Sequence, residues 1–61
     1  MRVLIVEDDE ALRDVTRRAL ASRGIAADTA SNGDEAIDKL SINDYDVVVF
    51  GLARILDATE D

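Results

Sequence analysis

The sequence predicts an α/β fold in which strands and helices alternate in the order β-α-β-α-β. The apolar run at residues 3–6 is continuous rather than alternating, which is typical of a strand that a parallel sheet buries on both faces, and the β-branched and aromatic run within residues 46–50 predicts a second buried strand. The segments between them contain apolar residues at helical spacing. Parallel strands are usually joined by helical crossover connections, so the pattern favours a small parallel sheet with covering helices.

The first strand ends abruptly at Glu7, and a helix is expected over residues 10–23. Four apolar residues recur there at helical spacing: Leu12, Val15, Ala19 and Leu20. Gly24 follows as a C-terminal stop. Residues 25–30 alternate weakly and predict a short second strand.

A turn at residues 31–34 precedes the second predicted helix. Ser31 and Asp34 fit a capping box. The Asn-Gly pair inside the turn is also typical of a hairpin, but the helical spacing of Ala36, Ile37 and Leu40 favours a helix that ends near residues 41–43. After the third strand, the spacing of apolar residues in 52–56 predicts a short C-terminal helical tail.

Length and charge exclude several classes of protein. The chain has 61 residues, 14 acidic and 7 basic, with a net charge of −7 and no cysteine or histidine, so a disulfide framework and a Cys/His zinc site are excluded. Acidic neighbours offset the clustered arginines, which argues against nucleic-acid binding. No apolar stretch reaches the ~18 residues of a membrane span, and a cytoplasmic location is expected. Since so short a chain buries little core, we expect a partner.

Four consecutive acids, Glu7 to Glu10, lie where the first strand leads into the first helix. One interpretation is helix capping, because a carboxylate at the N-cap accepts otherwise unpaired backbone N–H groups. The other is a cation site, because open α/β sheets bind ligands at the carboxyl ends of their strands and Mg²⁺ prefers oxygen ligands. The two are compatible, since Asp9 can cap the helix while Glu7 and Asp8 face the crevice.

Several motifs in order resemble the receiver domain of bacterial two-component response regulators, and the resemblance extends over residues 2–50. The matching segments are VLIVEDDEAL at 3–12, RRALASRG at 17–24, TASNGDEAIDKL at 29–40 and YDVVVF at 45–50. The resemblance implies a flavodoxin-like fold, here truncated to three parallel strands in the order 2-1-3. It divides the chain into a partial receiver domain at 1–50 and a divergent tail at 51–61, which we attribute to a frameshift, a truncation or engineering.

The resemblance also implies roles for particular residues. In the family, an acidic pair after the first strand binds Mg²⁺ together with a backbone carbonyl two residues beyond the phosphoacceptor; these positions are Glu7, Asp8 and Ala53. The phosphoacceptor is an aspartate at the end of the third strand, and its partner is a histidine kinase. Gly51 occupies that position here.

Because glycine has no side-chain oxygen, the sequence predicts that phosphoryl acceptance is absent. Asp46 lies on the same strand, but at about 3.3 Å per residue it is roughly 16 Å away, at the wrong end of the sheet. Asp57 belongs to the tail, whose position the sequence does not determine. We therefore expect no catalytic residue and no enzyme activity; a carboxylate acid/base enzyme is a poor alternative because no nucleophile or histidine accompanies the acids.

Two functions remain open. The first is a receiver fragment that binds Mg²⁺ weakly and self-associates as a dimer or higher oligomer. The expected contact is the exposed edge of the third strand, formed by Val47, Val48, Val49 and Phe50. The second is a non-catalytic interaction module that docks on an intact receiver or a histidine kinase.

Overall fold

The computed structural model describes residues 1–51 and confirms the predicted order of elements. These are β1 (Val3–Val6), α1 (Glu10–Ala21), β2 (Ala27–Ala30), α2 (Gly33–Ile42) and β3 (Val47–Phe50). The three strands form one parallel sheet in the order β2-β1-β3, as expected of a truncated receiver-type fold. Ala53, Asp57 and the predicted helical tail lie outside the described residues.

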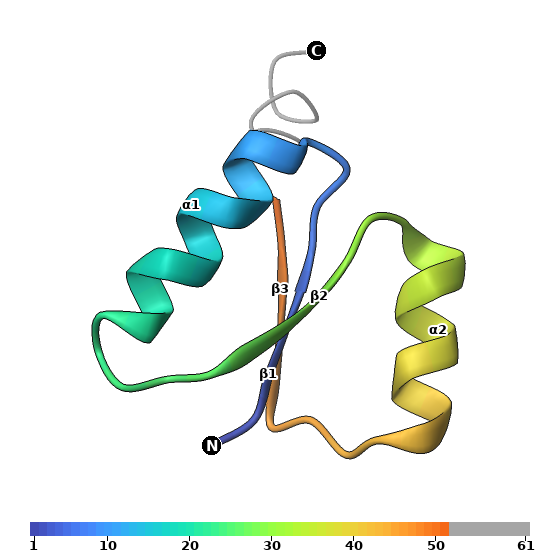
Figure 1. Cartoon of the computed structure of the whole chain (residues 1–61). Helices are drawn as coiled ribbons and strands as arrows, with labels where there is room; N and C mark the ends of the chain where they lie inside the picture. Colours follow the sequence, from blue (N-terminus) through green and yellow to red (C-terminus); the bar gives the residue numbers. More distant parts are fainter. Residues whose placement is uncertain (52–61) are drawn as a thin grey trace, which may run out of the picture.

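The sheet lies between the two helices, with α1 on one face and α2 on the other (Figure 1). The α2 face contains a core of Leu4, Val6, Ala30 and Ala36, against which Tyr45 and Val48 pack. On the α1 face, Ile5 and Val49 are adjacent in register and line a small apolar cavity together with Leu12 of α1. Alternate residues of each strand therefore face opposite helices, as the pleat of a strand requires.

The strands differ in burial. All four residues of β1 are buried, which agrees with its central position and its continuous apolar sequence. Both helices pack mainly against β1 and β2. By contrast, β3 is an edge strand within residues 1–51, and Val47 and Phe50 at its two ends remain 41% and 58% exposed.

An aspartate carboxylate caps the start of α1, and an asparagine amide oxygen caps the start of α2. The Asp9 side chain accepts a hydrogen bond from Leu12 N at 3.0 Å, as predicted for the N-cap of α1. At α2 the predicted capping pair was wrong by one residue. Asn32, not Ser31, is the N-cap and accepts from Glu35 N at 2.8 Å, while the Glu35 carboxylate accepts from the N–H and hydroxyl of Ser31.

The end of α1 also differs slightly from the prediction. The helix ends at Ala21 rather than at residue 23, and three turn residues follow it. Gly24, the last of them, has φ = 80°, a left-handed conformation that favours glycine. The predicted stop signal was therefore correct, and the second strand begins two residues later than expected, at Ala27.

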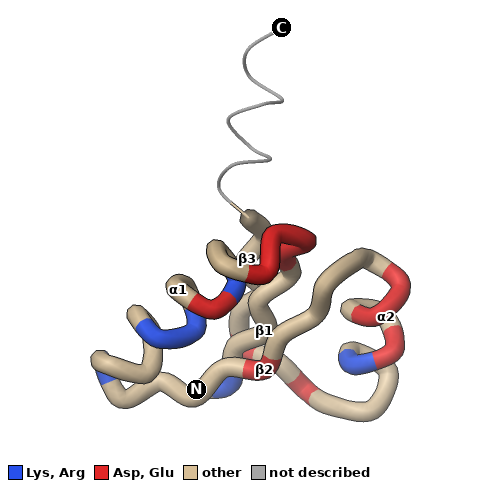
Figure 2. The backbone as a smooth tube through the Cα atoms, turned by 45° about the horizontal axis from the view of Figure 1, so that its top comes forward, with Lys and Arg blue, Asp and Glu red and all other residues tan. Residues whose placement is uncertain are grey.

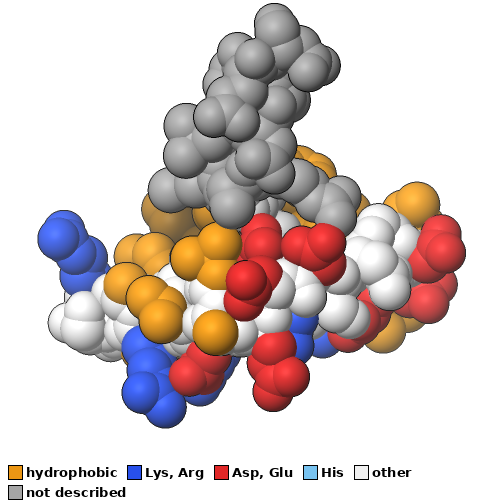
Figure 3. Space-filling model, turned by 90° about the horizontal axis from the view of Figure 1, so that it is seen from above, with side chains coloured by type: hydrophobic (Ala, Val, Ile, Leu, Met, Phe, Trp, Pro, Cys, Tyr) orange, Lys and Arg blue, Asp and Glu red, His pale blue; other side chains and the backbone are white. Residues whose placement is uncertain are grey.

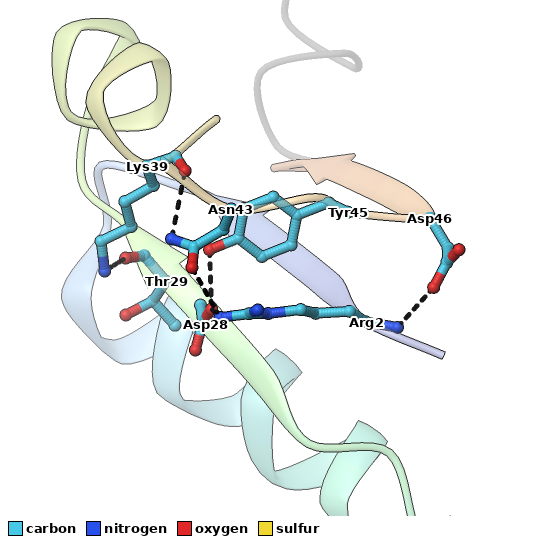
Figure 4. Close-up of polar contacts among 7 residues, drawn as sticks. All are labelled: Arg2, Asp28, Thr29, Lys39, Asn43, Tyr45 and Asp46. Atoms are coloured by element: carbon cyan, nitrogen blue, oxygen red, sulfur yellow. Dashed lines mark hydrogen bonds and ion pairs between the residues drawn. The ribbon is translucent and has the colours of Figure 1, made fainter. Parts of the chain in front are cut away.

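A polar cluster ties together the amino-terminal ends of the strands (Figure 4). We call it the Arg2 cluster; its members are Arg2, Asp28, Asn43, Tyr45 and Asp46. The Arg2 guanidinium extends across the Tyr45 ring, 5.2 Å from its centroid, and donates to Asp28 and Asn43 at 3.3 and 3.0 Å. The Tyr45 hydroxyl donates to Asp28 at 2.6 Å, and Arg2 N donates to Asp46 at 2.7 Å.

Charge is distributed unevenly over the fold. Arg13, Arg17 and Arg18 lie on α1, whereas acidic residues gather at the start of α1 and along α2 (Figure 2).

No helix in the part of the chain that the structure describes is long and apolar enough to cross a membrane.

Candidate functional site

The carboxyl ends of the strands border a crevice of about 510 Å³. Its walls come from three connected regions of the sheet: the end of β1, the β2–α2 turn and the end of β3. Lining residues include Val6, Glu7, Asp8, Ser31, Asn32, Phe50 and Gly51. Seen from this end of the sheet, acidic side chains gather beside hydrophobic ones (Figure 3). The parallel topology thus brings the predicted site residues Glu7, Asp8 and Gly51 to one place.

Glu7 is held tightly at the centre of the site and is only 5% exposed. Its backbone N–H donates to Ala30 O at 3.0 Å, and its carbonyl accepts from the Arg13 side chain at 2.9 Å. Its Oε1 accepts from Asp9 N at 3.2 Å. Its Oε2 is buried and has no hydrogen-bond partner. Because burying a carboxylate oxygen without a partner is costly, the Glu7 carboxylate would gain by turning toward a cation in the crevice.

Gly51 is buried next to Glu7. Its N–H donates to Val6 O at 3.1 Å, which continues the pairing of β3 with β1 beyond Phe50. A Cβ placed on Gly51 would overlap Oε2 and Cδ of Glu7 and would lie 3.0 Å from its Oε1. The Glu7 carboxylate therefore occupies the space that any side chain at position 51 would need.

The other predicted site residues are placed as follows. Asp8 is exposed and lines the crevice beside Glu7. Ala53 is outside the described residues. Asp46 lies at the opposite end of β3, where its carboxylate accepts from Arg2 N, so it is remote from the crevice as predicted. Within residues 1–51, no three acidic or other metal-ligating side chains converge on one point.

The donor set fits a hard cation that keeps much of its water. Two neighbouring carboxylates, at Glu7 and Asp8, supply only oxygen ligands, and Mg²⁺ commonly binds through one or two carboxylates with water in its remaining positions. The unpartnered Oε2 of Glu7 points to the same chemistry. The Glu35 carboxylate near the crevice already accepts hydrogen bonds from the hydroxyl and N–H of Ser31. These hydrogen bonds lower the pKa of Glu35.

The contact between Glu7 and Gly51 is the feature that the sequence did not indicate. The two residues are 44 positions apart, and they meet only because Val6 is adjacent to Phe50 in the register of β1 and β3. The one sequence signal was the glycine itself, placed where the resemblance requires an aspartate. The walls formed by Ser31 and Asn32 were expected as a turn but not as part of the site.

Comparison with known proteins gives a consistent family assignment for most of the chain. Residues 3–53 match the family model described as the response regulator receiver domain. Over 49 residues, 80% of this chain, the sequence is 43% identical to the transcriptional regulatory protein CutR of Streptomyces coelicolor. It is 41% and 39% identical over 49 residues to the response regulator MprA of Mycobacterium sp. strain KMS and of Mycobacterium avium.

The matched region is a small part of each relative. It covers 23% of CutR, 21% of MprA from strain KMS and 22% of MprA from Mycobacterium avium. The chain therefore spans less than a quarter of the length of these relatives. No solved structure gives a significant match.

Proposed function

Because this chain belongs to the response regulator receiver family, we propose that it is a receiver segment that binds a divalent cation weakly and accepts no phosphoryl group. Under this proposal the chain is not an enzyme. Its location is the cytoplasm, and its family partner is a histidine kinase. The observation that carries the proposal is the identity and placement of residue 51.

Gly51 lies at the carboxyl end of β3, beside the two carboxylates of the crevice. Transfer of a phosphoryl group to the protein needs a side-chain oxygen there as nucleophile, and glycine has none. Glu7 does not replace it, because its nearby oxygen is buried. Asp46 does not replace it either, because it is held by Arg2 at the other end of the strand.

Glu7 and Asp8 are the proposed ligands for Mg²⁺, with the backbone carbonyl of Ala53 as a third. When bound, the cation would neutralise part of the negative charge that the crevice concentrates. Weak affinity follows from the ligand set, since an aspartate at position 51 would have supplied a further carboxylate.

Phosphoryl acceptance is tested with a radiolabelled small-molecule acyl phosphate in the presence of Mg²⁺. We expect no label on the chain, while an intact receiver of the family, treated in parallel, becomes labelled. A hydroxylamine-sensitive acyl phosphate on the unchanged chain would contradict the proposal, and mass spectrometry of the labelled peptide would identify the residue responsible.

Self-association through β3 is the second part of the proposal. Gly51 N and Val47 N donate to β1, so the alternation of a parallel ladder directs the N–H groups of Val48 and Phe50 toward the free edge of the strand. An edge with unpaired N–H and C=O groups and exposed apolar residues at both ends favours pairing with a second copy. The net charge of −7 opposes that pairing, so association should strengthen with salt.

Two proline variants separate edge pairing from folding. Val48→Pro removes an N–H that faces the free edge, whereas Val49→Pro removes one that the ladder directs to β1. We expect the first variant to stay folded and become monomeric in sedimentation equilibrium, and the second to unfold. A monomeric unchanged chain at every micromolar concentration would contradict self-association.

The same exposed edge favours a second candidate function, an interaction module that docks on an intact receiver or a histidine kinase. Asp8→Asn discriminates between the two. If cation binding is the function, this variant weakens Mg²⁺ binding; if docking is the function, partner binding stays nearly unchanged and needs no Mg²⁺. Both quantities are measurable by isothermal titration calorimetry.

A further inference from the structure

The inward position of the Glu7 side chain depends on the absence of a side chain at position 51. The carboxylate lies where a Cβ of residue 51 would be, and its Oε2 is buried there without a hydrogen-bond partner. The crevice beside it has about 510 Å³ of space, bordered by Asp8. Glu7 lines this crevice, but its Oε2 lies in the space that glycine leaves and is not accessible to solvent.

We propose that Gly51 sets the cation affinity of this site through Glu7, by allowing the carboxylate to withdraw from the crevice. This inference deepens the proposed function and rests on its Mg²⁺ site. The glycine then has two consequences for cation binding. It supplies no side-chain oxygen of its own, and it lets the neighbouring Glu7 carboxylate lie out of reach of the cation.

The physical reason lies in the hydration of Mg²⁺. This cation releases water reluctantly and binds proteins with several waters in place. A hydrated ion in the crevice therefore cannot reach the Glu7 Oε2 while this atom is buried beside Gly51. In the inward arrangement Asp8 is the carboxylate of the pair that such an ion meets.

A methyl group at position 51 should reverse this arrangement. Within residues 1–51, Gly24 is the glycine that has a positive φ. The backbone of Gly51 therefore has a conformation that alanine can adopt. The atoms that the methyl group would overlap belong to the end of the flexible Glu7 side chain. The side chain can therefore move while the backbone stays in place, and the adjoining crevice has room for the carboxylate beside Asp8.

The test is a Mg²⁺ titration of the full chain by calorimetry, comparing the unchanged protein with Gly51→Ala. Alanine supplies no ligand, yet we expect roughly tenfold tighter binding, the effect of bringing one carboxylate within a few ångström of a divalent ion in mostly aqueous surroundings. Ser22→Ala, in the turn after α1 and outside the crevice lining, is the control, and its affinity should not change. The double variant Glu7→Gln with Gly51→Ala should lose the gain.

A second variant avoids any change at position 51. Glu7→Asp shortens the side chain so that its carboxylate no longer reaches the space beside Gly51, and it should also bind Mg²⁺ more tightly than the unchanged chain. If neither Gly51→Ala nor Glu7→Asp binds more tightly, the inference is overturned.

A measurement without metal distinguishes this failure from failure of the proposed function. In the unchanged chain, nuclear Overhauser contacts should join the Glu7 γ-protons to the Gly51 α-protons, and Gly51→Ala should lose the corresponding contacts. Contacts that persist in the alanine variant overturn the inference. Absence of Mg²⁺ binding by every variant at millimolar concentration overturns the proposed function instead.

Discussion

The two ends of the sheet use their acidic residues in opposite ways. At the amino-terminal end, Asp28 and Asp46 accept hydrogen bonds from Arg2, and Asp28 also accepts one from Tyr45 (Figure 4). At the carboxyl end, Glu7 retains a buried oxygen without a partner, within a run of four acids. The two carboxylates at the amino-terminal end thus stabilise the fold, whereas at the carboxyl end one carboxylate oxygen, Oε2 of Glu7, remains without a partner.

Topology explains why the ends differ. In an open parallel sheet, the carboxyl ends of the strands and the amino-terminal ends of the helices meet at one edge, and ligands bind there. The Arg2 cluster lies at the opposite edge, where the chain enters β1 and β3. Substitutions in the Arg2 cluster should therefore affect stability, whereas substitutions of the crevice carboxylates Glu7 and Asp8 should affect cation binding.

Arg2→Ala should give the largest loss of stability among the variants that test this comparison. The substitution removes two side-chain hydrogen bonds and a stacking contact on Tyr45, and we expect it to cost roughly 1–2 kcal/mol, limited by solvent screening because the guanidinium is half exposed. Urea unfolding followed by circular dichroism measures the effect. Arg23→Ala removes the same charge from the turn after α1 and should change stability much less. Equal losses in both variants would mean that net charge, not the cluster, is responsible.

Asp9→Ala tests an acid at the carboxyl end that has a structural role, the N-cap of α1. Loss of the hydrogen bond that it accepts from Leu12 N should destabilise the chain by about 1 kcal/mol. Asp9→Asn keeps an oxygen acceptor at the cap and should restore most of the stability in the same urea titration. Mg²⁺ affinity should change little in Asp9→Asn, and a large loss there would make Asp9 a cation ligand.

Tyr45→Phe should have a smaller effect that depends on pH. The hydrogen bond from Tyr45, and then that from Arg2, lowers the pKa of Asp28 below its ordinary value. This contribution to stability is therefore present above about pH 4 and is lost as the pH falls through the folded-state pKa. The same hydrogen bond raises the pKa of Tyr45, so its contribution is present below about pH 10 and is lost as the pH rises further.

The measurement for Tyr45→Phe is the urea midpoint as a function of pH. The variant should have a lower urea midpoint than the unchanged chain at neutral pH. The difference between the two midpoints should shrink toward low pH and toward high pH. A constant difference across the whole range would show that lost packing of the hydroxyl oxygen, and not its hydrogen bond to the Asp28 carboxylate, causes the effect.

Local patterns in the sequence were enough to predict the fold but not the site contact. The apolar run of β1 and the helical spacing in α1 depend on neighbouring residues, so the sequence alone identified those elements. The cap of α2 was predicted one residue too early, because Ser31 and Asn32 can both cap a helix and an acid follows each at the required spacing. Only the register of the sheet could reveal that Glu7 occupies the side-chain space of Gly51.

The Arg2 cluster was missed for the same reason. Arg2 and Asp28 lie 26 residues apart, and Arg2 and Asn43 lie 41 apart, so their contacts depend on how the strands are ordered. In the sequence, Tyr45 stands out only as the first residue of a segment that resembles receivers. A polar residue just before a buried strand gives no indication of its partner until the neighbouring strands are known.

Glu7→Gln should give the smallest change in stability, and in the opposite direction. The variant replaces a buried carboxylate by a neutral amide in a crevice that also holds Asp8, so without Mg²⁺ we expect a gain of less than about 1 kcal/mol. The remaining oxygen can still accept from Asp9 N, which keeps the local backbone in place. Urea unfolding without divalent ions measures the gain, and Mg²⁺ should stabilise the unchanged chain more than the variant. A loss as large as that of Arg2→Ala would mean that Glu7 is a structural residue, and the contrast between the two ends of the sheet would not hold.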